Sequence, residues 1–171
     1  MIQQDYRTGA SEELTQRAVD LRRMTEKEYA KYMEAHLEAY AQVRARAFKS
    51  SKDEELAVAK KQVRGLLKDG LKTKGHFIYV AVDSATGESV GNLWVHVEQD
   101  KKRAFLYDII VHERFRKQGY GRAMLNLLEV KMRQMHVAIL GLHVFAENEV
   151  AFNLYSKVGY VVASYNMQKN L

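Results

Sequence analysis

Cysteine and proline are both absent from this chain of 171 residues. Without cysteine there can be no disulfide framework and no thiolate metal site, so we expect no metal and a reducing, cytoplasmic location. Without proline, the breaks between elements must be made by glycine and polar residues. No apolar run approaches the roughly 18 residues that a membrane span needs, and the first residues lack the basic-then-apolar pattern of a signal peptide. We therefore expect no membrane partner.

The length suits one domain with a sizeable core. Residues 1–17 are polar and lack a core stripe, which predicts an N-terminal extension before a single domain over residues 18–171. The net charge of +6 suits an anionic partner, which could be nucleic acid, an acidic membrane surface or a phosphate-bearing cofactor. Charge alone does not choose among these partners.

The stretch at residues 104–128 joins an apolar, β-branched run to an amphipathic helical pattern through a basic loop. The loop, RKQGYG at residues 116–121, contains Gly119 and Gly121, which leave room for a ligand to approach the backbone. The helix that follows offers unpaired N–H groups and the positive end of its dipole. This pattern predicts a phosphate site, although an ordinary strand-to-helix turn with a solvated charge cluster has the same composition.

The spacing does not match two other phosphate loops. A dinucleotide loop would read G-x-G-x-x-G, and a Walker loop would continue with G-K-[ST]. The spacing R-x-x-G-x-G, carried by Arg116, Gly119 and Gly121, instead resembles the coenzyme A pyrophosphate loop of the GNAT N-acetyltransferase superfamily.

A second segment at residues 142–160 strengthens this resemblance. The family pattern N-x-x-A-x-x-x-Y-x-K-x-G-[FY] is met without a gap by Asn148, Ala151, Tyr155, Lys157, Gly159 and Tyr160. The resemblance extends over residues 19–171 and is greatest to uncharacterised GNAT proteins of bacillus type.

The periodicity along the chain predicts ten elements in the order βααβββαβαβ. Strands are expected at residues 18–24, 76–83, 89–97, 105–111, 137–145 and 160–167, and helices at 25–48, 51–70, 120–135 and 148–158. Capping boxes pair Thr25 with Glu28 and Ser51 with Glu54 at the starts of the first two helices. The fold class is α/β with a mixed sheet covered by helices on both faces, as in the GNAT fold.

The resemblance implies acetyl transfer from acetyl-CoA, as cosubstrate, to a primary amine of a small molecule, peptide or protein. It implies that backbone and side chains of the loop hold the cofactor pyrophosphate, that the central strand binds the pantetheine arm, and that Asn148 contacts the cofactor. The residues expected to bind cofactor are Ile109, Ile110, Val111, Arg116, Lys117, Gln118, Gly119, Tyr120, Gly121, Arg122 and Asn148. The family places at Tyr155 an acid that protonates the departing thiolate. Asn148 lies two helical turns before Tyr155, so one cleft can receive both side chains.

The general base is the least determined part of the site. Asp108 is the only carboxylate in the central strand, and a carboxylate in an apolar strand is costly unless it is bonded or functional, which suggests a base acting through water or a substrate anchor. Glu98, His96 and His143 are alternatives to Asp108 as the base. These three and Trp94 are also candidates for binding substrate, and each can equally be an ordinary packed residue.

Two other functional classes fit parts of the sequence. A catalytically silent acyl-CoA sensor or scaffold would keep the loop but lack the chemistry. A basic nucleic-acid module would need clustered aromatic and basic residues on one surface, and we expect no nucleic acid as a partner. The expected partners are acetyl-CoA and an amine acceptor that the sequence does not identify, and the sequence is compatible with a homodimer.

Overall fold

Five strands form one mixed sheet in the order β1-β2-β3-β4-β5 in the computed structural model, which describes residues 17–167 and 169. The strands are β1 (Val19–Arg23), β2 (His76–Asp83), β3 (Ser89–Glu98), β4 (Arg103–Val111) and β5 (Ile139–Leu142). The first four pair antiparallel, whereas β5 runs parallel to β4. A parallel neighbour requires a crossover, and the chain makes it through a helix between β4 and β5.

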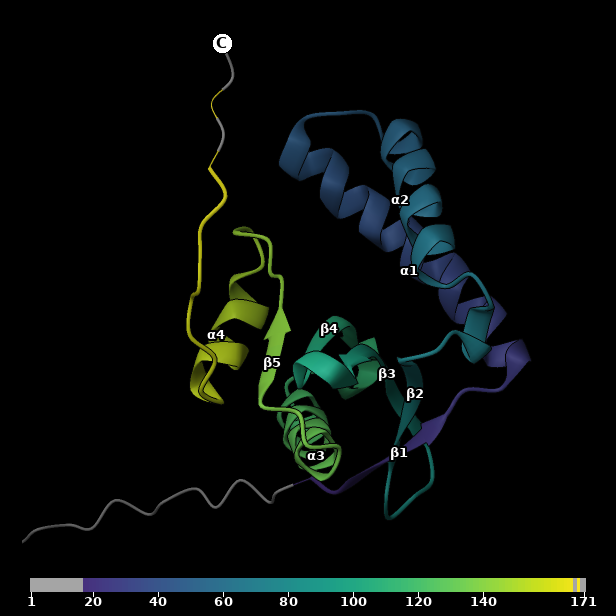
Figure 1. Cartoon of the computed structure of the whole chain (residues 1–171), viewed down its shortest axis with the longest axis vertical. Coiled ribbons are helices and arrows are strands. Elements are labelled where there is room, and N and C mark those ends of the chain that lie inside the picture. The colour runs from purple at the N-terminus through teal and green to yellow at the C-terminus, as the bar shows by residue number, and fades with distance from the viewer. Residues whose placement is uncertain (1–16, 168, 170–171) are drawn as a thin grey trace, which may run out of the picture.

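Four α-helices cover the sheet: α1 (Glu26–Phe48), α2 (Lys52–Leu66), α3 (Tyr120–Gln134) and α4 (Glu149–Lys157). Both expected capping boxes form, at Thr25 for α1 and at Ser51 for α2. In Figure 1 α1 and α2 run alongside each other, on the opposite side of the molecule from α3 and α4. None of the helices in the described part of the chain is long and apolar enough to cross a membrane.

The alternation of side chains along β3 divides the core into two layers. Leu93 and Val95 are fully buried with Met124 and Leu128 of α3 on one face of the sheet. Trp94 points to the other face, where it packs among side chains from α1, β2 and the end of α2. The mixed sheet with helices on both faces is therefore confirmed.

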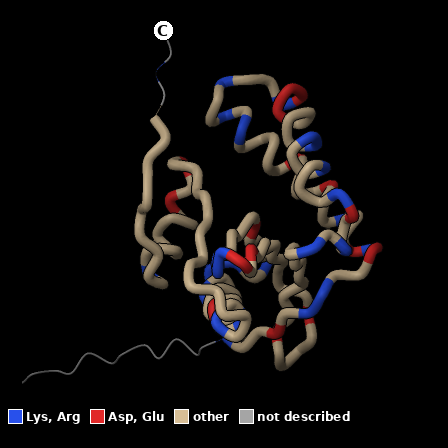
Figure 2. The backbone as a smooth tube through the Cα atoms, in the orientation of Figure 1, with Lys and Arg blue, Asp and Glu red and all other residues tan. Residues whose placement is uncertain are grey.

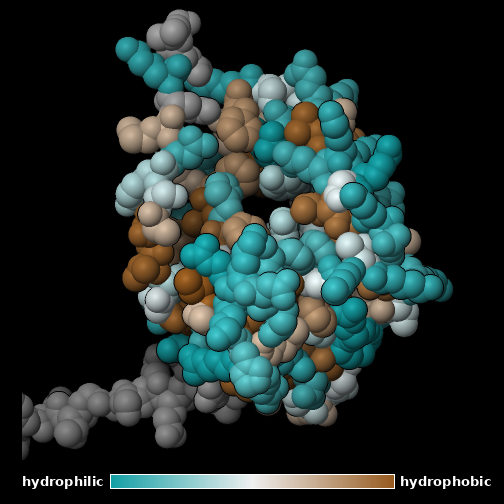
Figure 3. Space-filling view, in the orientation of Figure 1, coloured by the Kyte–Doolittle hydropathy of each residue, from teal (hydrophilic) through white to brown (hydrophobic). Residues whose placement is uncertain are grey.

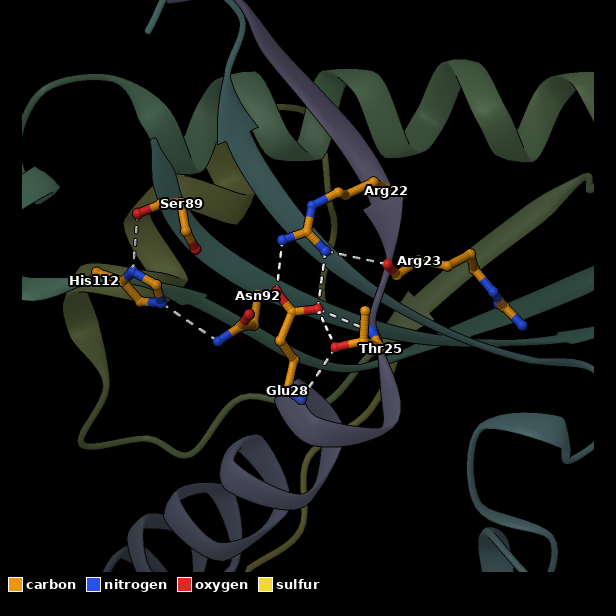
Figure 4. A network of polar contacts seen from close by, with 7 residues as sticks. All are labelled: Arg22, Arg23, Thr25, Glu28, Ser89, Asn92 and His112. Carbon is orange, nitrogen blue, oxygen red and sulfur yellow. Dashed lines mark hydrogen bonds and ion pairs between the residues drawn. The ribbon is translucent and has the colours of Figure 1, made fainter. Parts of the chain in front are cut away.

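Two polar networks fix the chain where strands meet the following segments (Figure 4). At the junction of β1 and α1, the Arg22 guanidinium donates to both carboxylate oxygens of Glu28, at 2.9 and 2.6 Å, and Glu28 also accepts from Thr25. At the end of β4, the His112 ring contacts the Ser89 carbonyl through Nδ1 at 3.2 Å and the Asn92 amide through Nε2 at 3.4 Å. The second network anchors the start of the basic loop to β3.

The buried face of α1 differs from the stripe of Tyr29, Met33, Leu37 and Tyr40 that helical spacing alone indicates. Buried side chains on this helix are Tyr32, Met33, His36 and Ala41, so its contact face is shifted and includes a histidine. On α2 only Glu55 and Ala59 are buried. The Glu55 carboxylate accepts from Arg44 Nε at 2.5 Å and from Ser50 at 2.7 Å, which ties the two helices together.

The expected last strand at residues 160–167 is wrong, because this segment forms no strand in the structure. A strand requires backbone pairing as well as alternating side chains, and none of the described strands pairs with it. Val161, Tyr165 and Met167 are 87%, 83% and 90% exposed. Figure 2 shows the segment running past α4 without a charged residue. The expected extension at residues 1–17 lies outside the described residues except for Arg17, whose guanidinium carbon is 5.2 Å from the Tyr120 ring centre.

Candidate functional site

The end of β4 separates from β5 at a bulge. Trp94 pairs with Asp108 but Val95 pairs with Leu106, so Tyr107 is the extra residue of the bulge. The pairing of β4 with β5 runs only from Arg103 to Leu106. On that side residues 107–111 have no neighbouring strand within the described part of the chain. The backbone groups that point away from β3 on this side are therefore open to an extended ligand that adds itself as a strand, except for the Val111 carbonyl, which accepts from Arg116 Nε.

A cavity of about 900 Å³ lies beside this open edge. Figure 3 shows the surface hollowed between the α1–α2 pair and the part of the molecule that contains α4. Its walls come from α1, α2, β3, β4, α4 and the loop after β5. They are mainly apolar and aromatic, and include Tyr40, Val63, Leu66, Trp94, Phe105, Tyr107, Ile109, Ile110 and Phe145. Apolar walls with few polar groups are typical of ligand sites.

Asp108 supplies the carboxylate in this cavity, and it is held by two residues of α1. The Tyr32 hydroxyl donates to its Oδ2 at 2.7 Å, and His36 Nδ1 lies 3.2 Å from the same oxygen. Burial and the negative charge of Asp108 raise the pKa of Tyr32 well above its usual value, so the phenol stays protonated as the donor. These contacts satisfy a carboxylate that would otherwise be costly on an apolar strand.

His36 is fixed by aromatic neighbours as well as by Asp108. Its ring stacks on Tyr40, with centroids 6.0 Å apart, and meets Trp94 edge-on at 5.7 Å. The sequence interpretation missed Tyr32 and His36. Their signal is the i, i+4, i+8 spacing of Tyr32, His36 and Tyr40, which places three rings on one stripe of α1.

Tyr155 and Asn148 both line the cavity, from α4 and its N-cap. Burial, followed by the negative charge of Asp108, raises the pKa of Tyr155 to about 12. Its hydroxyl is therefore protonated at neutral pH. The Asn148 side-chain oxygen accepts from the backbone N–H of Ala151 at 3.2 Å, so this residue also caps the helix, while its amide nitrogen is left for a ligand.

The basic loop leads from β4 into α3, and its Gly119, the N-cap of α3, has a φ of +90° in the left-handed region. No side chain caps α3, and the first helical hydrogen bond is the one that Ala123 donates to the Gly119 carbonyl. The backbone N–H groups of residues 120–122 therefore have no partner among the described residues. Together with the helix dipole, they form a site of positive potential suited to an anion.

The side chains of the loop have different surroundings. Arg116 Nε donates to the Val111 carbonyl at 3.2 Å, and the Gln118 amide donates to the Arg114 carbonyl at 2.8 Å. Tyr120 is buried and donates to Asp83 at 2.7 Å, so only its backbone can reach a ligand. The exposed cations are those of Arg116, Lys117 and Arg122.

The structure separates the expected site residues into three groups. The first group lines the cavity and consists of Asp108, Ile109, Ile110, Asn148, Tyr155, Trp94 and His143. A second group does not line the cavity and lies where β4 leads into α3: Val111, Arg116, Lys117, Gln118, Gly119, Tyr120, Gly121 and Arg122. His96 and Glu98 lie elsewhere: the His96 ring stacks on His76, and Glu98 pairs with Lys101. Within the described residues no group of three or more His, Cys, Asp or Glu could hold a metal ion.

Comparison with protein families gives one match over most of this architecture. The model of the acetyltransferase (GNAT) family matches residues 37–160, which include the second half of α1, all of α2, β4, the basic loop and α4.

Two curated relatives come from Bacillus subtilis (strain 168). The uncharacterised N-acetyltransferase YdgE is 28% identical over 156 residues, covering 90% of this chain and 99% of the relative. The uncharacterised N-acetyltransferase YycN is 30% identical over 150 residues, covering 86% and 96%.

Solved structures share the same arrangement. The crystal structure of YycN has a TM-score of 0.84 at 29% identity and covers 90% of this chain and 99% of its own. The aminoglycoside N-acetyltransferase AAC(6')-Iy, solved with CoA, has a TM-score of 0.53 at 15% identity over 91% of this chain and 95% of its own, which shows a shared fold.

Proposed function

The chain belongs to the acetyltransferase (GNAT) family, and from this premise we propose that it transfers an acetyl group from acetyl-CoA to a primary amine of a small molecule, peptide or protein. The observation that carries the proposal is the continuity of three features. An anion site at the start of α3 follows directly on the open edge of β4, and this edge leads to a cavity containing Asp108 and Tyr155.

The cofactor would bind along this path. Its pyrophosphate would accept from the N–H groups of residues 120–122, and the side chains of Arg116, Lys117, Gln118 and Arg122 would add charge and donors. The pantetheine arm would pair with the backbone of Ile109, Ile110 and Val111, because no strand occupies that side of β4 in the described residues. The thioester would then reach the cavity between Asp108 and Tyr155, with Asn148 beside the arm.

The transfer needs a nucleophilic amine and a proton for the leaving group. The amine nitrogen forms a bond to the thioester carbonyl carbon and loses a proton, the carbon–sulfur bond breaks, and the thiolate receives a proton. Tyr155 would supply that proton, because its raised pKa keeps the hydroxyl protonated until the thiolate departs. Asp108 gives the acceptor end a negative charge that attracts an amine.

Calorimetry with acetyl-CoA tests the first step, and CoA release with a panel of amines, peptide N-termini and aminoglycosides tests the second. We expect binding that weakens with salt, since phosphates are held by cations, and CoA release that depends on at least one acceptor. Absence of binding at millimolar acetyl-CoA would refute the proposal. Binding without turnover on any acceptor would favour the silent sensor. We also propose a cytoplasmic location, and a homodimer stays a proposal that sedimentation can test.

A further inference from the structure

We propose that His36 accepts the proton from the acceptor amine, and that Asp108 and Tyr32 are positioning residues that hold it in the competent tautomer. This inference rests on the proposed acetyl transfer, but it concerns which atom takes the proton. It starts from the surroundings of the Asp108 carboxylate, which is one of the candidates for the base that the sequence offers.

Asp108 is already occupied. Its Oδ2 accepts from Tyr32 at 2.7 Å and lies 3.2 Å from His36 Nδ1, and both partners are buried on α1. A carboxylate stabilised by a donor is a weaker proton acceptor than a free one, because protonation would forfeit these contacts. The negative charge of Asp108 is therefore better suited to orienting a neighbour than to taking the proton itself.

That neighbour is His36. His36 Nδ1 lies 3.2 Å from a negatively charged oxygen, and a proton on this nitrogen interacts favourably with that charge, whereas a lone pair there is repelled by it. The contact therefore selects the tautomer with the proton on Nδ1. In that tautomer Nε2 is the unprotonated nitrogen, and in the part of the chain that the structure describes it has no hydrogen-bond partner.

The ring is also held in place toward the cavity. Tyr40 stacks on the imidazole at an interplanar angle of 9°, Trp94 meets it at 74°, and His36 lines the cavity wall. A base fixed on three sides needs little reordering before it reacts. A rotating surface histidine would lack this preorganisation.

Each proton that moves in the reaction then has a donor and an acceptor. As the amine nitrogen bonds to the thioester carbonyl carbon, its proton passes to His36 Nε2, giving an imidazolium stabilised by Asp108. The carbon–sulfur bond breaks, and the thiolate takes the proton of Tyr155. His36 and Tyr155 return to their starting states by exchange with water after the products leave.

The tautomer can be measured without any acceptor. In a long-range ¹H–¹⁵N spectrum at neutral pH, His36 should show a protonated Nδ1 and an unprotonated Nε2, its signals being assigned by their loss in His36→Asn. Asp108→Asn should abolish this strong preference. His136→Asn is the matched control, because His136 is exposed and its φ of +57° is one that Asn tolerates. A wild-type ring with the proton on Nε2 would overturn the inference.

Kinetics provide the second arm, with the best acceptor from the amine panel. His36→Asn should lower kcat by on the order of 10²–10⁴ while leaving the acetyl-CoA Kd unchanged, because only the proton acceptor is lost. The titratable groups in contact with His36 are Tyr32 and Tyr40 from α1 and Asp108 from β4. The fall in kcat should be seen in His36→Asn and not in His136→Asn.

The outcomes separate the inference from the proposed function. If the wild type acetylates no amine, acetyl transfer fails although the tautomer result stands. If the wild type is active and His36→Asn keeps its kcat within twofold at every pH, the inference fails and acetyl transfer survives. Tyr32→Phe should lower kcat less than His36→Asn and shift the tautomer equilibrium, and a loss of stability without either effect would show a purely structural role.

Discussion

Tyr155 presents a phenol that stays protonated at neutral pH, since burial and the charge of Asp108 raise its pKa to about 12. Changing it to Phe removes the hydroxyl and keeps the ring in contact with the core around α3. We expect turnover to fall by on the order of 10²–10⁴, the usual effect of losing a positioned acid, with acetyl-CoA binding nearly intact.

Steady-state rates and calorimetry on Tyr155→Phe measure these two effects separately. The alkaline limb assigned to Tyr155 should lie near pH 12, above the range in which the fold can be assayed, so the wild-type profile should stay flat on its alkaline side up to about pH 10. Unchanged turnover in the Phe variant would leave water, or the thiolate itself, to complete the reaction.

His76 is a second residue whose protonation matters, here for stability. It is buried, its Nδ1 accepts from the Trp94 indole at 3.0 Å, and its ring stacks on His96 at 4.2 Å. Burial, followed by the charge of His96, lowers its pKa to about 4 from 6.5. The unfolded chain binds this proton more readily than the folded chain. The contribution of neutral His76 to the free energy of unfolding is therefore fully present above about pH 6.5 and is lost as the pH falls toward 4.

The loss should amount to on the order of 3 kcal/mol for this shift. Urea unfolding at several pH values, compared between the wild type and His76→Asn, isolates it from the carboxylates. The variant keeps an acceptor for the indole but does not titrate. Its free energy of unfolding should therefore change less with pH between pH 4 and 6.5 than that of the wild type. An NMR titration that places the His76 pKa near 6.5 would contradict the explanation.

Individual side chains could be predicted where a motif or a single charge marked them. Asp108, marked by its charge, and Tyr155, marked by the family motif, both line the cavity. His36 and Tyr32 could not be found by that route, because they act on Asp108 from a helix 72 and 76 positions away in sequence, as the residue numbers show. His96 was singled out for its strand position, yet its ring stacks on His76 and does not line the cavity.

At the scale of elements, Asn148 combines a cap with a place at the cavity. Asn148→Asp preserves an acceptor for the Ala151 N–H and adds a negative charge at the start of α4, so the free energy of unfolding should be unchanged or raised. Asn148→Ala should lose about 1 kcal/mol of stability. If the amide donates to the cofactor, both variants should bind acetyl-CoA more weakly, and wild-type affinity in Asn148→Asp would remove Asn148 from the cofactor site.

The two loop glycines differ in what a side chain would meet at each position. At Gly119 the φ of +90° makes any side chain strained, so Gly119→Ala should cost about 1 kcal/mol of stability as well as affinity. At Gly121 an added Cβ would lie 3.1 Å from Leu154 Cδ2, a movable methyl, and 3.6 Å from Val111 Cγ2. The better helix propensity of Ala, about 1 kcal/mol, should offset this crowding, leaving mainly a loss of cofactor affinity.

Thermal unfolding with and without acetyl-CoA distinguishes these effects. Gly87→Ala is the matched control, since Gly87 has a φ of +73° with open space around it, away from the loop. It should lose stability as Gly119→Ala does but keep the full ligand-induced shift. The same full shift in Gly121→Ala would show that the backbone there does not contact the cofactor.

Elements whose determinants are local could be read from the sequence. The capping boxes at Thr25 and Ser51 lie within four residues of the helix starts they define, and both helices begin where expected. The segment at residues 160–167 has the β-branched and aromatic residues of a strand but forms no strand, because pairing depends on a partner elsewhere in the chain. The bulge at Tyr107 is likewise a matter of register between β3 and β4, which side-chain periodicity does not encode.

Across the whole molecule, the two faces of the sheet are packed unequally. The face under α3 has a large buried core that includes Leu93, Val95, Met124 and Leu128. The opposite face is partly given to the cavity, and α2 contributes only Glu55 and Ala59 as buried side chains along its 15 residues. The side of the sheet that borders the cavity is therefore held by fewer buried apolar contacts than the side covered by α3.

Hydrogen exchange should reveal this inequality. We expect amides of α2 to exchange at a lower opening free energy than those of β3 and α3, because local opening follows the amount of buried apolar surface. Acetyl-CoA should slow exchange at residues 107–111 and 120–122, whose N–H groups it would engage, and should leave α2 nearly unaffected. An acceptor amine should then protect α2, since residues 61–63, 65 and 66 line the cavity. Exchange of α2 only through global unfolding would show instead that the acceptor wall is as rigid as the sheet.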